Sequence, residues 1–213
     1  MVRVPGPAKM RRLLYIPVIH TQADMGALAP TVRRMTIQRL GHGAWQRNLD
    51  VIGRLWVDIR RTVEGWDLPW ETVRLYQDGL PRCGREREIV AELAGAGSPN
   101  HQLLLSLMEG GAALMGTESP DLLVKEYALA QRMVAAEAPK EPARAEARCR
   151  AESRTLLGLR DRYIARRINE SLRAGETGLL FLGLLHSLEP WLARDIQVAY
   201  PILRPLPPSR QTR

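Results

Sequence analysis

Continuous apolar runs and helical periodicity alternate along this chain. Residues 13–19 and 179–185 are uninterrupted apolar runs, which is the pattern of strands buried on both faces of a sheet. Residues 195–200 alternate between apolar and polar and predict another strand, and residues 73–76 predict a short one. Between residues 44 and 63, apolar side chains recur every three or four positions, which predicts an amphipathic helix.

Helix-start and helix-stop residues divide the rest of the chain. We expect further helices at about residues 86–93, 100–108 and 122–133, and a long one that ends near residue 174. Strands that alternate with helices predict an α/β fold with a central mixed or mostly parallel sheet flanked by helices. We expect a single domain over residues 1–200, and the Pro/Arg-rich residues 201–213 predict an extended tail.

Composition narrows the class of protein. The chain has 213 residues, of which 45% are hydrophobic and 25% charged, as in a globular protein with a sizeable core. No apolar run reaches the roughly 18 residues that a membrane span needs, and the N-terminal segment lacks the pattern of a secretory signal. Cys83 and Cys149 give no disulfide framework, so we expect a cytoplasmic protein that does not enter a membrane.

The net charge of +8 raises the question of an anionic partner. Two segments of net positive charge, residues 1–62 and 141–213, flank a segment of net negative charge, residues 63–140. The two basic segments either form a basic face or pair with the acidic segment in the fold. Arginine makes up 28 of the 31 basic residues, and the tryptophans show no stacking pattern, so we do not expect nucleic acid as the partner. No phosphate-binding loop, dinucleotide fingerprint or nucleophile elbow occurs, so we expect neither a nucleotide cofactor nor a serine nucleophile.

Two of the four histidines follow the two longest apolar runs. His20 follows residues 13–19 and His186 follows residues 179–185, and the two stretches match in residue class except for Pro17 against Gly183. If the strands are parallel neighbours, both imidazoles lie at the carboxyl edge of the sheet, where ligands and catalytic groups collect. The alternative is that each histidine only caps its strand by bonding a nearby carbonyl.

The long helix carries a charged pair beside its apolar stripe. Arg160 and Asp161 lie three or four residues from apolar members of that stripe. A guanidinium drawn toward the core needs a carboxylate, phosphate or carbonyl partner. The alternative is a core face made of Leu156, Leu159 and Tyr163, with Arg160 shielded by its neighbours.

With these motifs, the sequence resembles the TraB/Tiki and erythromycin-esterase-like (ChaN-like) superfamily. The family pattern is two G-x-x-H motifs, a glutamate between them, and an R-[ND]-x-x-[MI] helix before the second motif. Residues 183–186 match the second motif and residues 160–164 match the helix, whereas residues 17–20 carry proline in place of the first glycine. For the glutamate we predict Glu126, with Glu118 as the alternative.

The resemblance implies a hydrolase pocket with His20, Glu126, Arg160 and His186 as catalytic residues. His20, Glu126 and His186 could hold Mn²⁺, Zn²⁺ or Co²⁺, and a metal-bound water would attack an ester or amide of a small-molecule or peptide substrate. Without a metal, one histidine would act as the general base and Arg160 would stabilise the oxyanion. The alternative is a non-catalytic binding or regulatory protein for an anionic ligand.

Three further segments have two interpretations each. Asp24 either caps a helix or supports the His20 site as a further ligand or partner. Asp78 either belongs to a plain turn or faces the same pocket. The Ala/Arg-rich residues 141–174 could also form a homodimer contact.

Overall fold

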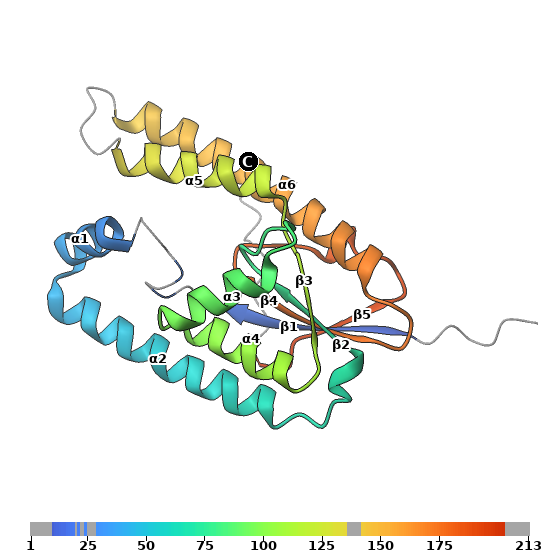
Figure 1. Cartoon of the computed structure of the whole chain (residues 1–213). Coiled ribbons are helices and arrows are strands. Elements are labelled where there is room, and N and C mark those ends of the chain that lie inside the picture. The colour runs from blue at the N-terminus through green and yellow to red at the C-terminus, as the bar shows by residue number, and fades with distance from the viewer. Residues whose placement is uncertain (1–9, 20, 22–23, 25–28, 136–141, 203–213) are drawn as a thin grey trace, which may run out of the picture.

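Five parallel strands form one sheet, in the order β3-β2-β4-β1-β5 (Figure 1). The computed structural model describes residues 10–19, 21, 24, 29–135 and 142–202. The strands are β1 (Arg11–Val18), β2 (Val73–Gln77), β3 (Ala113–Met115), β4 (Thr177–Gly183) and β5 (Ile196–Ala199). The helices are α1 (Ala29–Leu40), α2 (His42–Glu64), α3 (Glu86–Gly95), α4 (Pro99–Glu109), α5 (Pro120–Ala135) and α6 (Pro142–Ser171), with short 3₁₀ helices η2 (Trp70–Thr72) and η3 (Glu189–Trp191).

The two strands predicted from the apolar runs, β1 and β4, are parallel neighbours. Leu14 pairs with Leu179, and Val18 pairs with Gly183. Pro17 is tolerated inside β1 because β5 pairs with this strand only as far as Leu14, so Pro17 has a paired strand on one side. The predicted fold class, an α/β sheet flanked by helices, is therefore confirmed, with every ladder parallel.

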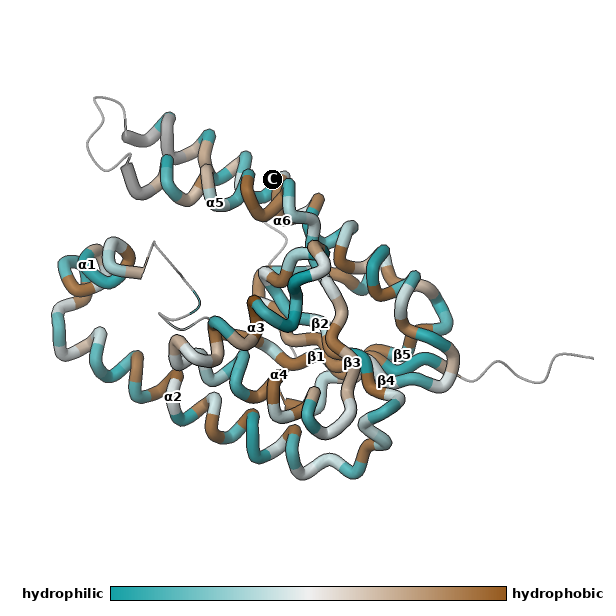
Figure 2. Tube along the Cα trace, viewed as in Figure 1, coloured by the Kyte–Doolittle hydropathy of each residue, from teal (hydrophilic) through white to brown (hydrophobic). Residues whose placement is uncertain are grey.

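Alternate residues of the strands enter two separate cores. Leu14 packs on the face covered by α2, α3 and α4, together with Ile59 of α2 and Leu104 of α4. Leu13 packs on the opposite face, against Ile164 of α6. Figure 2 shows hydrophobic positions concentrated in the central strands. Helices on both faces explain why β1 and β4 read as continuous apolar runs.

The position of β4 decides which segments can meet. The chain moves from β1 to β2, two places away in the sheet, and β4 later fills the gap between them. Because all five strands are parallel, their carboxyl ends lie at one edge of the sheet. The segments that follow β1, β2, β3 and β4 therefore come together at that edge.

Two helix pairs extend beyond the sheet. α1 has no buried residue and packs on α2, and α5 packs on α6. In Figure 1 both pairs reach out to the left of the strands. No helix in the described part of the chain is both long enough and apolar enough to cross a membrane.

Some elements differ from what the pattern predicts. The strand predicted over residues 179–185 is wrong at its end, because β4 ends at Gly183. The next two residues, Leu184 and Leu185, are exposed. The backbone N–H of His186 donates to the carbonyl of Gly183 at 3.2 Å, which closes a turn. Leu184 and Leu185 extend the apolar run in the sequence, although they lie in this turn. His186 is therefore separated from the end of β4 by the turn.

Neither α1 nor the three-residue β3 was predicted. Of the tail, residues 203–213 lie outside the described residues.

Gly178 gives a direct test of the packing around β4. A Cβ atom at Gly178 would lie 2.7 Å from Leu13 Cδ1 and 3.1 Å from Tyr76 Cε2. We expect Gly178→Ala to lower the free energy of unfolding by about 1–3 kcal/mol, because the core must shift to admit the methyl group. Urea denaturation followed by circular dichroism measures this change.

Gly158→Ala is the matched control for this prediction. Gly158 lies within α6, and a Cβ there would meet nothing within 4 Å. We expect this variant to be more stable than the wild type by about 0.5–1 kcal/mol, because alanine favours the helix. Equal stability of Gly178→Ala and the wild type would contradict the packing described here.

Candidate functional site

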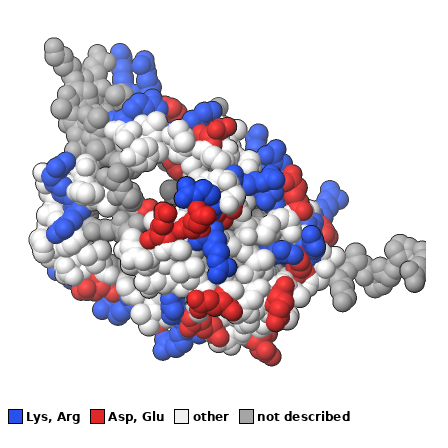
Figure 3. All heavy atoms as spheres, viewed as in Figure 1, with Lys and Arg blue, Asp and Glu red and all other residues white. Residues whose placement is uncertain are grey.

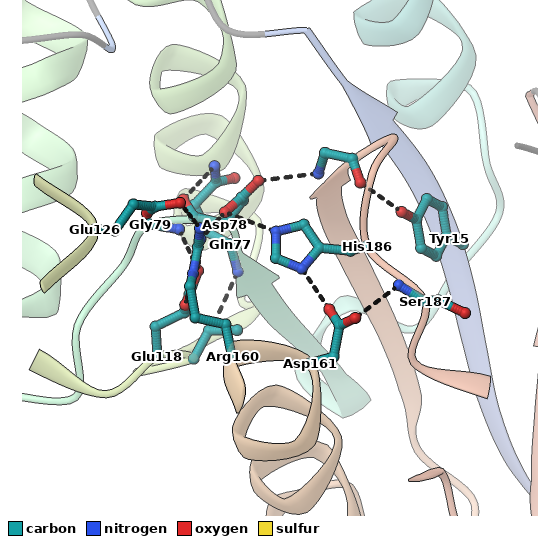
Figure 4. A network of polar contacts seen from close by, with 12 residues as sticks. Tyr15, Gln77, Asp78, Gly79, Glu118, Glu126, Arg160, Asp161, His186 and Ser187 are labelled. Atoms are coloured by element: carbon teal, nitrogen blue, oxygen red, sulfur yellow. Dashed lines mark hydrogen bonds and ion pairs between the residues drawn. The ribbon is translucent and has the colours of Figure 1, made fainter. Parts of the chain in front are cut away.

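Charged side chains gather at the carboxyl edge of the sheet. Asp78 follows β2, Glu118 follows β3 and His186 follows β4. Arg160 and Asp161 reach the same edge from α6, and Figure 4 shows all five in one network of polar contacts. Parallel strands bring together residues that are more than 100 positions apart in the sequence.

Arg160 is the centre of this network. Its Nε donates to Glu118 Oε2 at 2.7 Å and its Nη2 donates to Glu118 Oε1 at 2.5 Å, which makes a bidentate contact. The same Nη2 donates to Asp78 Oδ1 at 2.7 Å, and Nη1 donates to Glu126. Arg160 is only 5% exposed, whereas Leu159 lies on the surface. The interpretation with Leu159 in the core is therefore wrong, and the guanidinium has the carboxylate partners that its burial requires.

Burial and charge act in opposite directions on these groups. Burial by itself lowers the pKa of Arg160, but the hydrogen bonds and negative charge of Glu118, Asp78 and Glu126 outweigh it and raise that pKa. Glu118 is fully buried, and burial raises the pKa of its carboxyl although Arg160 opposes the change. Arg160 therefore stays charged, and its charge compensates the carboxylates around it.

Glu118 also fixes the backbone between β2 and α3. Its Oε1 accepts the N–H of Gly79 at 2.9 Å, and its carbonyl accepts the N–H of Arg82 at 2.8 Å. Gly79 has a positive φ of 73°, which favours glycine at this turn. The turn after β2 is thus held against the segment after β3, and this contact brings Asp78 and Glu118 to the same guanidinium.

His186 is held by the residue next to Arg160 on α6. Its Nδ1 lies 2.5 Å from Asp161 Oδ1, and Asp161 Oδ2 accepts the backbone N–H of Ser187 at 3.1 Å. A carboxylate can only accept here, so Nδ1 carries a hydrogen and donates it to Asp161. Nε2 lies 3.7 Å from Asp78 Oδ1, and the histidine side chain is only 4% exposed. Nε2 therefore faces the Arg160 network.

Asp78 connects the two halves of the network. Its Oδ1 contacts Arg160, and its Oδ2 accepts the N–H of Gly183 at 3.0 Å. A Cβ at Gly183 would lie 2.9 Å from Asp78 Oδ2, so any larger residue there would have to displace this carboxylate. The carbonyl of Gly183 accepts the hydroxyl of Tyr15 at 3.0 Å, and burial, with a smaller contribution from Asp78, raises the pKa of Tyr15.

The predicted site residues have different positions in this structure. Arg160 and His186 lie in one network, joined through Asp78. Glu126, on α5, binds the outer side of Arg160, and its side chain is 44% exposed. Glu118, the alternative, is the buried partner of Arg160. His20 lies outside the described residues.

The metal prediction depends on His20. Within the described ranges, no three His, Cys, Asp or Glu side chains are arranged to hold a metal ion. The carboxylates of Asp78 and Glu118 already bind Arg160, so a cation there would compete with the guanidinium for the same oxygens. The described residues alone do not fit a metal, and the set of His20, Glu126 and His186 stays a prediction.

Sequence reasoning missed part of this arrangement. The sequence singled out Asp161 as the neighbour of Arg160, in the charged pair beside the apolar stripe and in the helix motif, but gave no sign that it binds His186. Asp78 was interpreted mainly as a turn residue, although its position just after a predicted strand places it at the carboxyl edge of a parallel sheet. No sequence signal pointed to Tyr15, whose hydroxyl binds a backbone carbonyl.

Asp24 takes part in a second polar cluster, at the N-terminus of α4. Its Oδ1 accepts the hydroxyl of Ser98 at 2.6 Å, and its Oδ2 accepts the N–H of Thr21 at 2.6 Å. Ser98 Oγ also lies 2.7 Å from Nδ1 of His101. Burial alone would raise the pKa of Asp24, but hydrogen bonds from His101, Ser98 and Thr21 lower it to about 2. This carboxylate thus joins the segment after β1 to α4.

Comparisons with known proteins identify no family for this chain. Neither a family model, nor a curated protein, nor a solved structure matches the chain. We therefore infer a function from the geometry of the Arg160 and His186 contacts alone.

Removing Arg160 should be costly. Arg160→Met leaves the carboxylates of Glu118 and Asp78 buried without their partner, so we expect the free energy of unfolding to fall by about 3–5 kcal/mol. Arg154→Ala, an exposed arginine on the same helix, should change it by less than about 0.5 kcal/mol. Denaturant titration of both variants tests this, and equal losses would contradict a special role for Arg160.

The lowered pKa of Asp24 predicts that the stability of the fold changes with pH in the acid range. Its pKa is lowered from 3.8 to about 2 in the folded protein, so its ionised form stabilises the fold above about pH 4. This stabilisation, about 2 kcal/mol, should disappear as the pH falls from 4 to 2. Denaturant titrations of the wild type and Asp24→Asn across this range should show their difference shrinking, and a constant difference would contradict the prediction.

Proposed function

We propose that this protein is a hydrolase of ester or amide bonds, in which His186 acts as general base. The observation that carries the proposal is the buried imidazole of His186, bound at Nδ1 by Asp161 and directed with Nε2 toward Asp78. A carboxylate that fixes one nitrogen of a histidine sets its tautomer and its orientation, which is how general bases are prepared for proton transfer. The site lies where parallel α/β sheets commonly place their chemistry.

The proposed reaction needs few parts. A water molecule attacks the acyl carbon, and its proton passes to Nε2 of His186 as the new C–O bond forms. The proton then moves to the leaving oxygen or nitrogen when the acyl bond breaks. Asp161 stabilises the imidazolium that exists between these steps, and Asp78, with Oδ1 at 3.7 Å from Nε2, adds a second negative charge nearby.

Arg160 has a different role from the one expected of an oxyanion stabiliser. All three guanidinium nitrogens, Nε, Nη1 and Nη2, donate to the carboxylates of Glu118, Glu126 and Asp78. A guanidinium so engaged has little positive charge left to offer a substrate. We assign Arg160 to holding Asp78 in place beside His186, so it acts as a positioning residue.

We also propose membership of the TraB/Tiki and erythromycin-esterase-like superfamily. In support, Arg160, from the helix motif, and His186, from the second histidine motif, both contact Asp78. The close approach at Gly183 gives a physical reason for the glycine of that motif. Of the two candidate glutamates, Glu118 has the stronger support, because it is buried and binds Arg160 through two hydrogen bonds.

The alternative, binding of an anionic ligand, has less support at this site. Four carboxylates, those of Asp78, Glu118, Glu126 and Asp161, surround one guanidinium and one imidazole, and such a balance repels anions. Figure 3 shows acidic and basic side chains intermixed on the visible face, without a continuous basic area. A small-molecule or peptide substrate, a cytoplasmic location and a homodimer through residues 141–174 stay predictions.

His186→Asn tests the proposed function. We expect hydrolysis of p-nitrophenyl acetate to fall by about 100-fold or more, because the general base is lost while the side chain keeps its approximate size. Asp161→Asn should also lower the rate, because the amide can donate to Nδ1 and favour the wrong tautomer. Initial rates with each purified variant measure both effects.

His42→Asn is the control for these variants. His42 lies exposed at the start of α2, away from Asp78 and Asp161, and its replacement should leave the rate unchanged. Circular dichroism and thermal melting establish that each variant is folded. A folded His186→Asn protein that hydrolyses the ester at the wild-type rate would contradict the proposal.

A further inference from the structure

The backbone of Gly183, the last residue of β4, binds three partners at the site. Its N–H donates to Asp78 Oδ2 at 3.0 Å. Its carbonyl accepts the hydroxyl of Tyr15 at 3.0 Å and the backbone N–H of His186 at 3.2 Å. A carbonyl oxygen has two lone pairs, so these two donors fill it. The position of Gly183 therefore affects both Asp78 and His186, whose side chains face each other at Nε2.

Tyr15 approaches Gly183 from the neighbouring strand and has little freedom to move. It lies in the middle of β1, where it pairs with Leu180 of β4. Its side chain belongs to the core on the α6 face, and only 4% of the residue is exposed. The ring lies against that of Tyr200, with 5.3 Å between the two ring centroids. A ring packed in this way holds its hydroxyl at a fixed point.

The surroundings of Tyr15 keep its hydroxyl a donor. Burial, with smaller contributions from the negative charges of Asp78 and Asp161, raises the pKa of Tyr15 well above its ordinary value. The hydroxyl therefore keeps its proton over the pH range in which a histidine acts as a base. Figure 4 shows Tyr15 and Asp78 joined through one backbone residue, beside the ring of His186.

Packing alone does not account for a hydroxyl at this position. Leu13, on the same face of β1, and Leu182 of β4 fill this core with aliphatic side chains, and phenylalanine would occupy the same space as Tyr15. A buried hydroxyl needs an acceptor, and here the acceptor is the carbonyl at which the turn to His186 begins. The contact thus joins β1 to the turn that carries His186.

We propose that Tyr15 is a positioning residue, whose hydroxyl holds the backbone of Gly183 and thereby sets the 3.7 Å separation between His186 Nε2 and Asp78 Oδ1. The proposal rests on the proposed function, in which His186 is the general base and Asp78 adds negative charge beside it. Tyr15 then acts on the reaction without contact to the substrate. A base that moves from its productive position loses rate even when the substrate still binds.

Tyr15→Phe in the full-length protein tests this, with Tyr76→Phe as the matched control. Tyr76 is a fully buried tyrosine of the same core, and its hydroxyl contacts Ser171 Oγ at 2.9 Å, away from Gly183. Each variant removes one buried hydroxyl and keeps the ring, so a general loss of stability should affect both alike. Circular dichroism and thermal melting compare their stabilities.

Nitrogen-15 NMR of histidine-labelled protein reports the protonation and hydrogen bonding of each ring nitrogen, and His186→Asn identifies the His186 signals. We expect Tyr15→Phe to move these signals, because the turn that carries the ring loses its anchor. For the part of p-nitrophenyl acetate hydrolysis that His186→Asn abolishes, kcat should fall by about fivefold or more while KM stays the same. Tyr76→Phe should leave the His186 signals and kcat unchanged.

A folded Tyr15→Phe protein with unchanged His186 signals or with full kcat would overturn the proposal, as would an equal fall of kcat in Tyr76→Phe. If Tyr15→Phe does not fold, the same measurements are made in the more stable Gly158→Ala background and compared with Gly158→Ala alone. Failure of the proposed function is a separate result, in which His186→Asn keeps its activity while Tyr15→Phe still moves the His186 signals.

Discussion

A single buried guanidinium holds the carboxyl edge of this sheet together. Arg160 comes from α6 and binds Asp78 after β2, Glu118 after β3 and Glu126 on α5, so it joins four parts of the chain. The carboxylates of Asp78 and Glu118 would be costly to bury without it, and Arg160 would be costly to bury without them. The positions of these elements at the edge, and with them the surroundings of His186, therefore depend on one set of charged hydrogen bonds.

Much of the fold could be predicted from the sequence, because a strand that is buried on both faces of a sheet appears as a continuous apolar run. The runs at β1 and β4 and the helical seam of α2 follow directly from apolar spacing. The turn at Leu184 could not be predicted in this way, since its leucines continue the apolar run of the strand. The strand β3 could not be predicted either, because three residues are too few to show an alternation of apolar and polar positions. Local pattern predicts elements well when the core dictates every position, and poorly at their ends.

The site was predictable to a lesser degree. The need of Arg160 for an anionic partner followed from its place beside an apolar stripe, and the structure supplies three. Which carboxylates they are depends on the sheet order, which brings the ends of β2 and β3 beside α6. The pairing of Asp161 with His186 depends equally on the turn after β4. Tertiary geometry of this kind is not contained in the spacing of residues along one segment.

The late entry of β4 into the middle of the sheet has a consequence for how the protein is made. During synthesis, β1, β2 and β3 leave the ribosome well before β4, and the place between β1 and β2 stays open until residues 177–183 emerge. Until then two apolar strands each have an unpaired backbone edge, which is a template for pairing with another chain. Nascent chains that stop before β4 should therefore depend on chaperones more than the complete protein does.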